Sequence, residues 1–221
     1  MSRSLVSHSF AARSALVGAL AAASLVPTTM ASAAITSDPP ARELIQPEFL
    51  RSSGTGCAPG TFSTMIGADA PTFSAIFDTY YLSPASPQSS CRLVFRINGV
   101  PANYTYAVNS VRYYGHVLLN DDQRPVMTTR YSITGSTAPR QRTIMPVATE
   151  DDGSWYLVDE VPESDLVWAP CGHAAGQEIT LDSTLTAQGP ADPSSDLGLF
   201  SIDLNTRVTD PTGVGVVWKR C

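Results

Sequence analysis

Alternation between apolar and polar residues is the feature that most constrains how this chain can fold. The clearest cases are residues 179–187 and 200–208, where apolar side chains recur at second positions among Thr, Ser, Asp, Asn and Arg. In the second segment, Phe200 and Ile202 are assigned to the buried face. A period of two indicates an extended strand with one apolar face, whereas an amphipathic helix repeats every 3.6 residues. The sequence therefore predicts an all-β protein whose sheets each bury one face.

Turn residues divide the region after Cys57 into eight or nine such strands. Residues 62–66 and 73–77 flank a Gly-Ala-Asp-Ala-Pro segment and predict a hairpin. The apolar parity changes near Asn109-Ser110, so a bulge or tight turn is expected there. The fold class that fits is an antiparallel β-sandwich of jelly-roll or immunoglobulin-like kind. The predicted strands cover residues 62–66, 73–77, 93–97, 104–119, 126–134, 155–161, 179–187, 200–208 and 214–218.

Residues 1–33 have the features of a secretory signal peptide. Two arginines come early, an uncharged run of small apolar residues covers 14–26, and Ala31-Ser32-Ala33 supplies a small-x-small cleavage site. As a helix that run would be about 20 Å long, too short for a bilayer core that needs roughly 20 residues. We expect cleavage after Ala33, or after Ala34, with no membrane span in the mature chain. The predicted location is secreted and extracellular.

The mature chain is expected to be acidic. Removing the signal peptide takes away Arg3 and Arg13 and leaves 12 basic and 20 acidic side chains, a net charge near −8. Lys219 is the only lysine, and no segment carries a basic cluster. Nucleic acids and anionic lipid surfaces are bound through such clusters. Neither is therefore an expected partner.

All four cysteines, Cys57, Cys91, Cys171 and Cys221, follow the signal peptide. An even number in an exported chain predicts two structural disulfides. A zinc site would need closely spaced cysteine pairs, but the smallest gap here is 34 residues. We expect no metal or other cofactor. Of the three possible connectivities, we favour Cys57 with Cys91 and Cys171 with Cys221.

The expected domain organisation has three parts. Residues 1–33 are the signal peptide, and residues 34–56, rich in Pro, Ser, Thr and Gly, are predicted to be a flexible leader, propeptide or stalk. Residues 57–221 then form one disulfide-stapled β-sandwich domain, since no low-complexity spacer divides them. We expect this domain to be a monomer.

Three short segments and the cysteine order resemble a known family. The segments are Cys57–Thr61, Leu166–Gly172 and Val217–Cys221, and Cys91 opens a strand between the first two. Over residues 57–221 the chain is similar to the domain-of-unknown-function family 4360, small exported proteins of bacteria and fungi. The resemblance implies secretion and a β-rich disulfide fold, but no catalytic residues. The matching positions are Cys57, Pro59, Gly60, Thr61, Cys91, Trp168, Pro170, Cys171, Gly172, Trp218, Arg220 and Cys221, together with the similar Tyr113-Tyr114-Gly115.

No pattern in the chain predicts catalysis. The G-x-S-x-G motif of many serine hydrolases is absent, and so is the Asp-x-Asp-x-Asp-Gly loop of calcium sites. His116 lies in a tyrosine-rich strand and His173 follows a cysteine turn, so both are interpreted as structural or loop residues. Glycosidases need two facing carboxylates, and the alternative hypothesis is a secreted hydrolase built on the acidic segment 150–165 with one histidine. Its candidate residues are Asp151, Asp152, Asp159, Glu160, Glu163 and Asp165.

Aromatic residues are the remaining binding candidates. Trp168 and Trp218, each close to a cysteine, are interpreted as packing near the disulfides. Tyrosines gathered on one exposed face would bind glycans or proteins, although ordinary β propensity also explains them. We therefore expect a non-catalytic extracellular binding or surface-associated module with a glycan or protein ligand; a secreted effector or inhibitor stays open. Asn103 starts the single glycosylation sequon. The tyrosines considered are Tyr80, Tyr81, Tyr104, Tyr106, Tyr113, Tyr114 and Tyr131.

Overall fold

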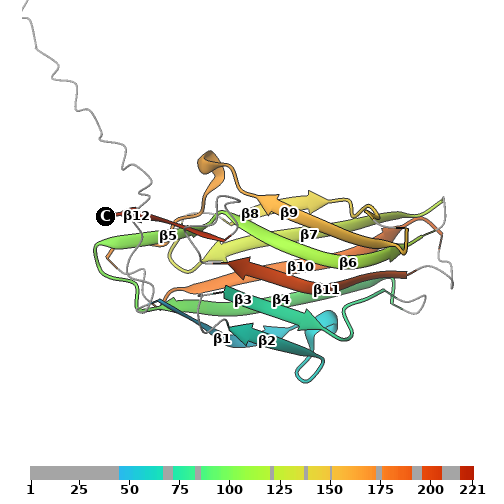
Figure 1. The fold of residues 1–221 in the computed structure, drawn as a ribbon, viewed down its shortest axis with the longest axis horizontal. Helices are drawn as coiled ribbons and strands as arrows, with labels where there is room; N and C mark the ends of the chain where they lie inside the picture. The colour runs from blue at the N-terminus through green and yellow to red at the C-terminus, as the bar shows by residue number, and fades with distance from the viewer. Residues whose placement is uncertain are drawn as a thin grey trace, which may run out of the picture. The chain divides into compact units, whose positions relative to one another are not determined.

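The computed structural model shows an all-β domain (Figure 1). It describes residues 45–66, 72–82, 86–119, 122–136, 139–149, 151–172, 176–190, 196–205 and 215–221. The predicted signal peptide and residues 34–44 lie outside these ranges. The elements are β1 (Gln46–Ser53), η2 (Thr55–Cys57), β2 (Phe62–Ile66), β3 (Thr72–Phe77), β4 (Gln88–Asn98), β5 (Tyr104–Val108), β6 (Ser110–Leu118), β7 (Arg124–Ile133), β8 (Arg140–Ile144), β9 (Ser154–Glu160), η3 (Glu163–Asp165), β10 (Glu178–Gln188), β11 (Asp196–Asn205) and β12 (Val216–Arg220), where η marks a short 3₁₀ helix.

The strands form two five-stranded antiparallel sheets and one short strand pair. One sheet has the order β1-β4-β10-β7-β8, and the other has the order β2-β3-β11-β6-β9. The final strand, β12, pairs with β5. Since β5 is followed by β6 after a single residue, Asn109, the end of the chain attaches beside the start of β6. The break expected at Asn109-Ser110 is confirmed.

Eight of the strands follow the connections of a jelly roll. Counted along the chain, β3, β4, β6, β7, β8, β9, β10 and β11 give the sheet orders 1-8-3-6 and 2-7-4-5. In this arrangement successive strands pass between the two sheets at every step except β7 to β8. Strands β1 and β2 add one strand to each sheet, beyond β4 and β3. Of the two sandwich types that the sequence left open, the structure is therefore the jelly roll.

The structure corrects two expectations about extent. It contains twelve strands in its described part, more than the eight or nine predicted. Residues 46–53, expected to belong to a flexible leader over 34–56, form β1, which pairs with β4 along seven residue pairs. Strand β8 was also not predicted, because its sequence, Arg-Gln-Arg-Thr-Ile, has almost no apolar alternation. Both strands lie at sheet edges, where one side of the strand stays in water.

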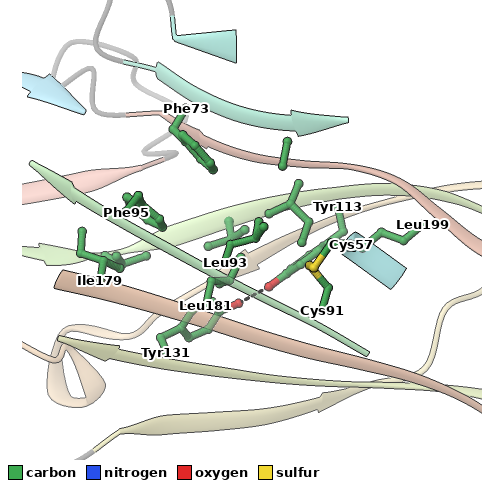
Figure 2. Packing of buried hydrophobic residues seen from close by; sticks show 14 of the residues in the cluster. Cys57, Phe73, Cys91, Leu93, Phe95, Tyr113, Tyr131, Ile179, Leu181 and Leu199 are labelled. Atoms are coloured by element: carbon green, nitrogen blue, oxygen red, sulfur yellow. Dashed lines mark hydrogen bonds between the residues drawn. A yellow bond between two sulfur atoms is a disulfide. The ribbon is translucent and has the colours of Figure 1, made fainter. Parts of the chain in front are cut away.

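The core lies between the two sheets (Figure 2). Phe73 of β3 stacks on Phe95 of β4, with ring centroids 4.9 Å apart, and so joins one sheet to the other. Further along the sandwich the hydroxyl of Tyr80 donates a hydrogen bond to Ser183 of β10 at 3.0 Å. Trp155 is also fully buried. Removing this much apolar surface from water is the main stabilising contribution to such a fold.

Two disulfides hold segments far apart in the sequence. Cys57 pairs with Cys91 inside the core and ties η2 to β4, and Cys171 pairs with Cys221 at the surface and ties the end of the chain to the loop before β10. These are the two pairs favoured from the sequence. Trp218, interpreted as a core residue, is buried and packs against Tyr106 with ring centroids 5.6 Å apart.

Candidate functional site

Four large aromatic side chains are exposed on the outer side of the sheet β2-β3-β11-β6-β9. They are Tyr81, Tyr114, Tyr156 and Phe200, with exposed fractions of 52%, 42%, 49% and 43%. We call these four residues the aromatic face. Monomeric β-sandwiches normally turn polar residues to water, so a group of exposed rings on one sheet marks a candidate interaction surface.

Three of these rings come from three adjacent strands. The sheet order places β6 between β11 and β9. Tyr114 of β6 is directly opposite Tyr156 of β9, and Phe200 of β11 lies on the other side with its ring centroid 5.7 Å from that of Tyr114. Adjacent strands are about 4.8 Å apart. The rings therefore form a row that crosses the strands.

Tyr81 lies beside this row, next to Gly198 of β11. The backbone of Tyr81 forms an isolated bridge with Gly198. A methyl group placed on Gly198 would lie 3.4 Å from the Tyr81 side chain and 3.9 Å from the Phe200 ring. Gly198, which has no side chain, therefore lies between Tyr81 and Phe200.

A polar group borders the row on one side. The imidazole of His116 stacks on Phe200 with ring centroids 6.3 Å apart, and its Nδ1 atom lies 3.5 Å from the Asp196 carboxylate. The other ring nitrogen lies 2.8 Å from the carbonyl oxygen of Asp152. The backbone N–H of Ser154 donates a hydrogen bond to the Asp152 carboxylate, and this bond lowers the pKa of Asp152. His116 therefore joins the candidate surface at its margin, held by neighbours on two sides.

The outer side of the other sheet has a different character. Three ion pairs join side chains of β1, β4 and β10, two between adjacent strands and one from β1 across β4 to β10, with nitrogen–oxygen distances of 2.5–2.9 Å. Threonines of β10, β7 and β8 lie beside and beyond these pairs. The arginine partners lower the pKa values of Glu48 and Glu178. This side resembles an ordinary solvated face, and the ion pairs are Arg51–Glu178, Arg92–Asp182 and Arg96–Glu48.

The structure separates the tyrosines that the sequence grouped together. Only Tyr81 and Tyr114 are exposed, whereas the other five considered, Tyr80, Tyr104, Tyr106, Tyr113 and Tyr131, are buried.

Two members of the aromatic face were missed by sequence reasoning. Phe200, assigned to the buried face, is exposed because the register shifts between Leu199 and Ser201. Leu199 faces the core in its place, while Ile202 is buried as predicted. Tyr156 was overlooked, although alternation along its strand indicates its position. It directly follows the buried Trp155, so its side chain points to the opposite, solvent-facing side of β9.

The acidic residues of segment 150–165 do not gather at one place. Asp151 and Asp152 lie in the turn before β9, whereas Glu163 and Asp165 lie in η3 after it. The seven residues of β9 separate the two groups by roughly 20 Å at 3.3 Å per residue. Paired carboxylates of glycosidases lie within about 10 Å. These two groups therefore do not form such a pair.

Among the described residues of that segment, Asp159 is the one buried carboxylate. Its side chain is 0% exposed and accepts hydrogen bonds from the Tyr131 hydroxyl at 2.6 Å and from the guanidinium groups of Arg140 and Arg142. Tyr131 is bonded in turn to the hydroxyl of Tyr113 (Figure 2). Burial raises the pKa of Tyr131, and the Asp159 charge adds to the effect. Both carboxylate oxygens of Asp159 accept hydrogen bonds within the protein. Because Asp159 belongs to β9 and its partners belong to β7 and β8, the network connects the two sheets.

The remaining candidates from the sequence form no further site in the described part of the chain. His173 lies outside the described residues. No three His, Cys, Asp or Glu side chains within those residues are arranged to hold a metal ion.

Trp168 is half-buried, and the Lys219 amine lies 4.1 Å from its ring centroid. Asn103 is exposed in the turn before β5. Over the described ranges, no helix has the length and hydropathy of a membrane span.

Fold and surface together define a disulfide-bonded jelly-roll domain with an aromatic face on one sheet. The chain belongs to the family described as Domain of unknown function (DUF4360), whose model matches residues 47–221. This confirms the resemblance seen in the cysteine motifs, and it places the start of the family region inside β1.

A curated relative and three solved structures show similarity. An uncharacterized secreted protein of Arthroderma benhamiae is 26% identical over 140 residues, which cover 61% of this chain and 56% of the relative, so the chain spans about half of that protein. The secreted location predicted from the sequence agrees with this relative and with the two disulfides.

The structural similarities are distant. A structure of TmCBM61 with β-1,4-galactotriose is 12% identical, with a TM-score of 0.34, and covers 70% of this chain and 87% of its own. A broad bean stain virus structure is 11% identical, with a TM-score of 0.31 and coverages of 75% and 91%. A deformed wing virus structure is 12% identical, with a TM-score of 0.25 and coverages of 100% and 65%.

Proposed function

We propose that this protein is a non-catalytic extracellular module that binds a neutral polysaccharide chain on its aromatic face. The observation that carries the proposal is the row of Phe200, Tyr114 and Tyr156 on three adjacent strands, each more than two-fifths exposed. Keeping three large rings in water is unfavourable unless a ligand covers them.

The chemistry of the row suits a sugar polymer. The C–H faces of a pyranose are apolar and pack on aromatic rings, while its hydroxyl groups bond to polar groups at the margin. Tyrosine serves both needs because its ring is apolar and its hydroxyl donates and accepts hydrogen bonds. A row about 10 Å long, from β11 to β9, can support successive rings of a linear chain.

The absence of charge within the row favours a neutral ligand. The rings themselves carry no charge, and the ionic groups of the same face flank the row: Arg112 and His116 lie two residues to either side of Tyr114 on β6, and His116 contacts Asp196. An acidic polysaccharide would instead need a basic surface, and the printed sequence has a net charge of −6. A protein partner or a second copy of this chain would cover the same rings, and the test below separates these occupants.

The test is a binding assay on the secreted, oxidised protein. Insoluble and soluble neutral wall polysaccharides are screened by pull-down, and the best oligosaccharide is titrated by calorimetry. Replacing Tyr114, Tyr156 or Phe200 by Ala is expected to weaken binding about tenfold each, the loss of roughly 1.4 kcal/mol of ring stacking. The control is Met145→Ala, since Met145 is 69% exposed and lies away from the row.

Two results would overturn the proposal. One is the absence of binding to every polysaccharide by a correctly folded, disulfide-bonded sample. The other is sedimentation showing that the wild type is a dimer and that Phe200→Ala makes it a monomer, which would assign the face to a second copy. Because the replaced rings are exposed, the variants are expected to melt like the wild type, so a loss of binding reports on the surface itself.

A further inference from the structure

Two neighbouring depressions lie at the edge of the sandwich, between β8, β9 and η3. One has a volume of about 560 Å³ and the other about 530 Å³. Arg140 and Asp165 line both, so the depressions form one groove. Trp168 lines one end and Val158 lines the other. None of the four exposed aromatic residues is part of it.

The groove begins next to the end of the aromatic row. Val158 follows Tyr156 by two residues on β9, so the two side chains share one side of the strand, about 7 Å apart. Since β9 is the last strand of its sheet, a chain that crosses Phe200, Tyr114 and Tyr156 reaches this edge next. The rings and the groove are therefore consecutive parts of one surface.

The groove contains a donor and an acceptor that do not satisfy each other. Arg140 is held in place from below, by the Asp159 carboxylate at 3.3 Å and the Tyr131 ring at 5.8 Å. Asp165 accepts a hydrogen bond from the Ser164 hydroxyl at 3.0 Å. Although Arg140 and Asp165 line the same groove, no ion pair joins them in the described structure.

Such an arrangement fits a polar, uncharged ligand. Two guanidinium groups and two carboxylates line the groove, Arg140 and Arg142 together with Glu160 and Asp165, so it presents charges of both signs. A vicinal pair of sugar hydroxyls can accept from an arginine and donate to a carboxylate at once. The half-buried indole of Trp168 adds an apolar wall at the far end.

We propose that the groove is a second saccharide subsite, with Asp165 and Arg140 bonding to adjacent hydroxyls of a neutral sugar, and that it binds the same chain as the aromatic face. This inference rests on the proposed function. It specifies the ligand further as a long linear neutral polysaccharide, bound along its length. Affinity should therefore keep rising with chain length after the aromatic row is filled.

The experiment compares short and long oligosaccharides of one series on matched variants. Asp165→Asn keeps the shape of the side chain and removes its charge. Glu163→Gln is the control, because Glu163 is an exposed acid of the same 3₁₀ turn but does not line the groove. Both positions are exposed, and thermal melts are expected to match the wild type.

We expect Asp165→Asn to weaken binding of long chains about tenfold, the effect of one hydrogen bond to a charged group, and to leave binding of a disaccharide or trisaccharide unchanged. Glu163→Gln should change neither. If long chains bind Asp165→Asn as well as wild type while Phe200→Ala still loses binding, the groove is no subsite and the proposed function stands. If Phe200→Ala and Tyr114→Ala also bind normally, the proposed function itself fails.

Discussion

The hydroxyl of Tyr131 donates a hydrogen bond of 2.6 Å to the carboxylate of Asp159, across the interior between the two sheets. Tyr131 belongs to β7 of one sheet and Asp159 to β9 of the other. At this edge the sandwich is therefore closed by a polar network that includes Arg140 and Arg142, while aromatic packing between β1 and β2 closes the opposite edge. The groove proposed as a sugar subsite lies directly over the network.

Replacing Asp159 should strongly destabilise the fold. Asp159→Ala leaves two guanidinium groups and a buried hydroxyl without their acceptor, and breaking a buried pair in this way costs about 3–5 kcal/mol. Urea unfolding measures the change in the free energy of unfolding. The control is Glu160→Ala on the adjacent, exposed position, which should have little effect. Equal stability of the two variants would show that the network does not hold the edge.

Stability is expected to fall at alkaline pH. Burial raises the pKa of the Tyr80, Tyr106, Tyr113 and Tyr131 hydroxyls above the ordinary value of 10.0. Above pH 10 the unfolded chain loses phenolic protons that the folded chain keeps, so the folded state binds more protons and the free energy of unfolding decreases as the pH rises.

Urea midpoints and tyrosinate absorbance, measured on both sides of pH 10, check this dependence. Tyr131→Phe should reduce the slope above pH 10, because it removes one of the titrating groups. A free energy of unfolding that does not change across this range would contradict the buried, protonated state of these hydroxyls.

Gly115 should tolerate no side chain. A methyl group there would lie 2.2 Å from the carbonyl oxygen of Gly198 and 2.6 Å from the indole of Trp155. Gly115→Ala is therefore expected to cost about 1–3 kcal/mol or more by overpacking. Gly198→Ala is the matched control on the facing strand, since its methyl group would meet neighbours only at 3.4 Å and beyond. Thermal melts of the two variants compare them, and equal melts would refute the packing argument.

The two disulfides should differ in their reactivity. Cys57 and Cys91 are at most 2% exposed, whereas Cys171 and Cys221 are exposed. Because thiol exchange needs access to the sulfur, a mild reductant with an alkylating agent should label Cys171 and Cys221 first, which peptide mass spectrometry detects. Initial labelling of Cys57 would contradict the burial of that bridge.

Loss of the exposed bridge should still matter for stability. Exchanging Cys171 and Cys221 for Ser opens a loop closed over 50 residues, which should lower the free energy of unfolding by about 2–4 kcal/mol. The same change removes the covalent attachment of β12, whose Trp218 is buried in the core. A melting temperature equal to that of wild type would show that β12 stays docked without the bridge.

Much of the fold was predictable because a strand with one buried face has alternating apolar and polar residues in its sequence. The hairpin of β2 and β3, the break at Asn109 and the long strand β10 agree with alternation alone. Strands β1 and β8 were missed because their sequences alternate little, and each is held at a sheet edge by backbone pairing with one neighbour. Such pairing needs no particular side chains.

The candidate site was much less predictable. Tyr114 and Phe200 are 86 positions apart in the sequence, and only the pairing of β6 with β11 brings their rings together. The register shift at Leu199–Ser201 then turns Phe200 outward, and a single irregular residue of this kind cannot be read from periodicity.

The sequence by itself determined an all-β, disulfide-bonded domain with four cysteines in the order of its family, because period and cysteine spacing are local properties of the chain. The tertiary structure alone decided the jelly-roll topology, the burial of five tyrosines and the exposure of Tyr81, Tyr114, Tyr156 and Phe200 on one face. These depend on which strands become neighbours and in which register, and those relationships arise only when the two sheets pack.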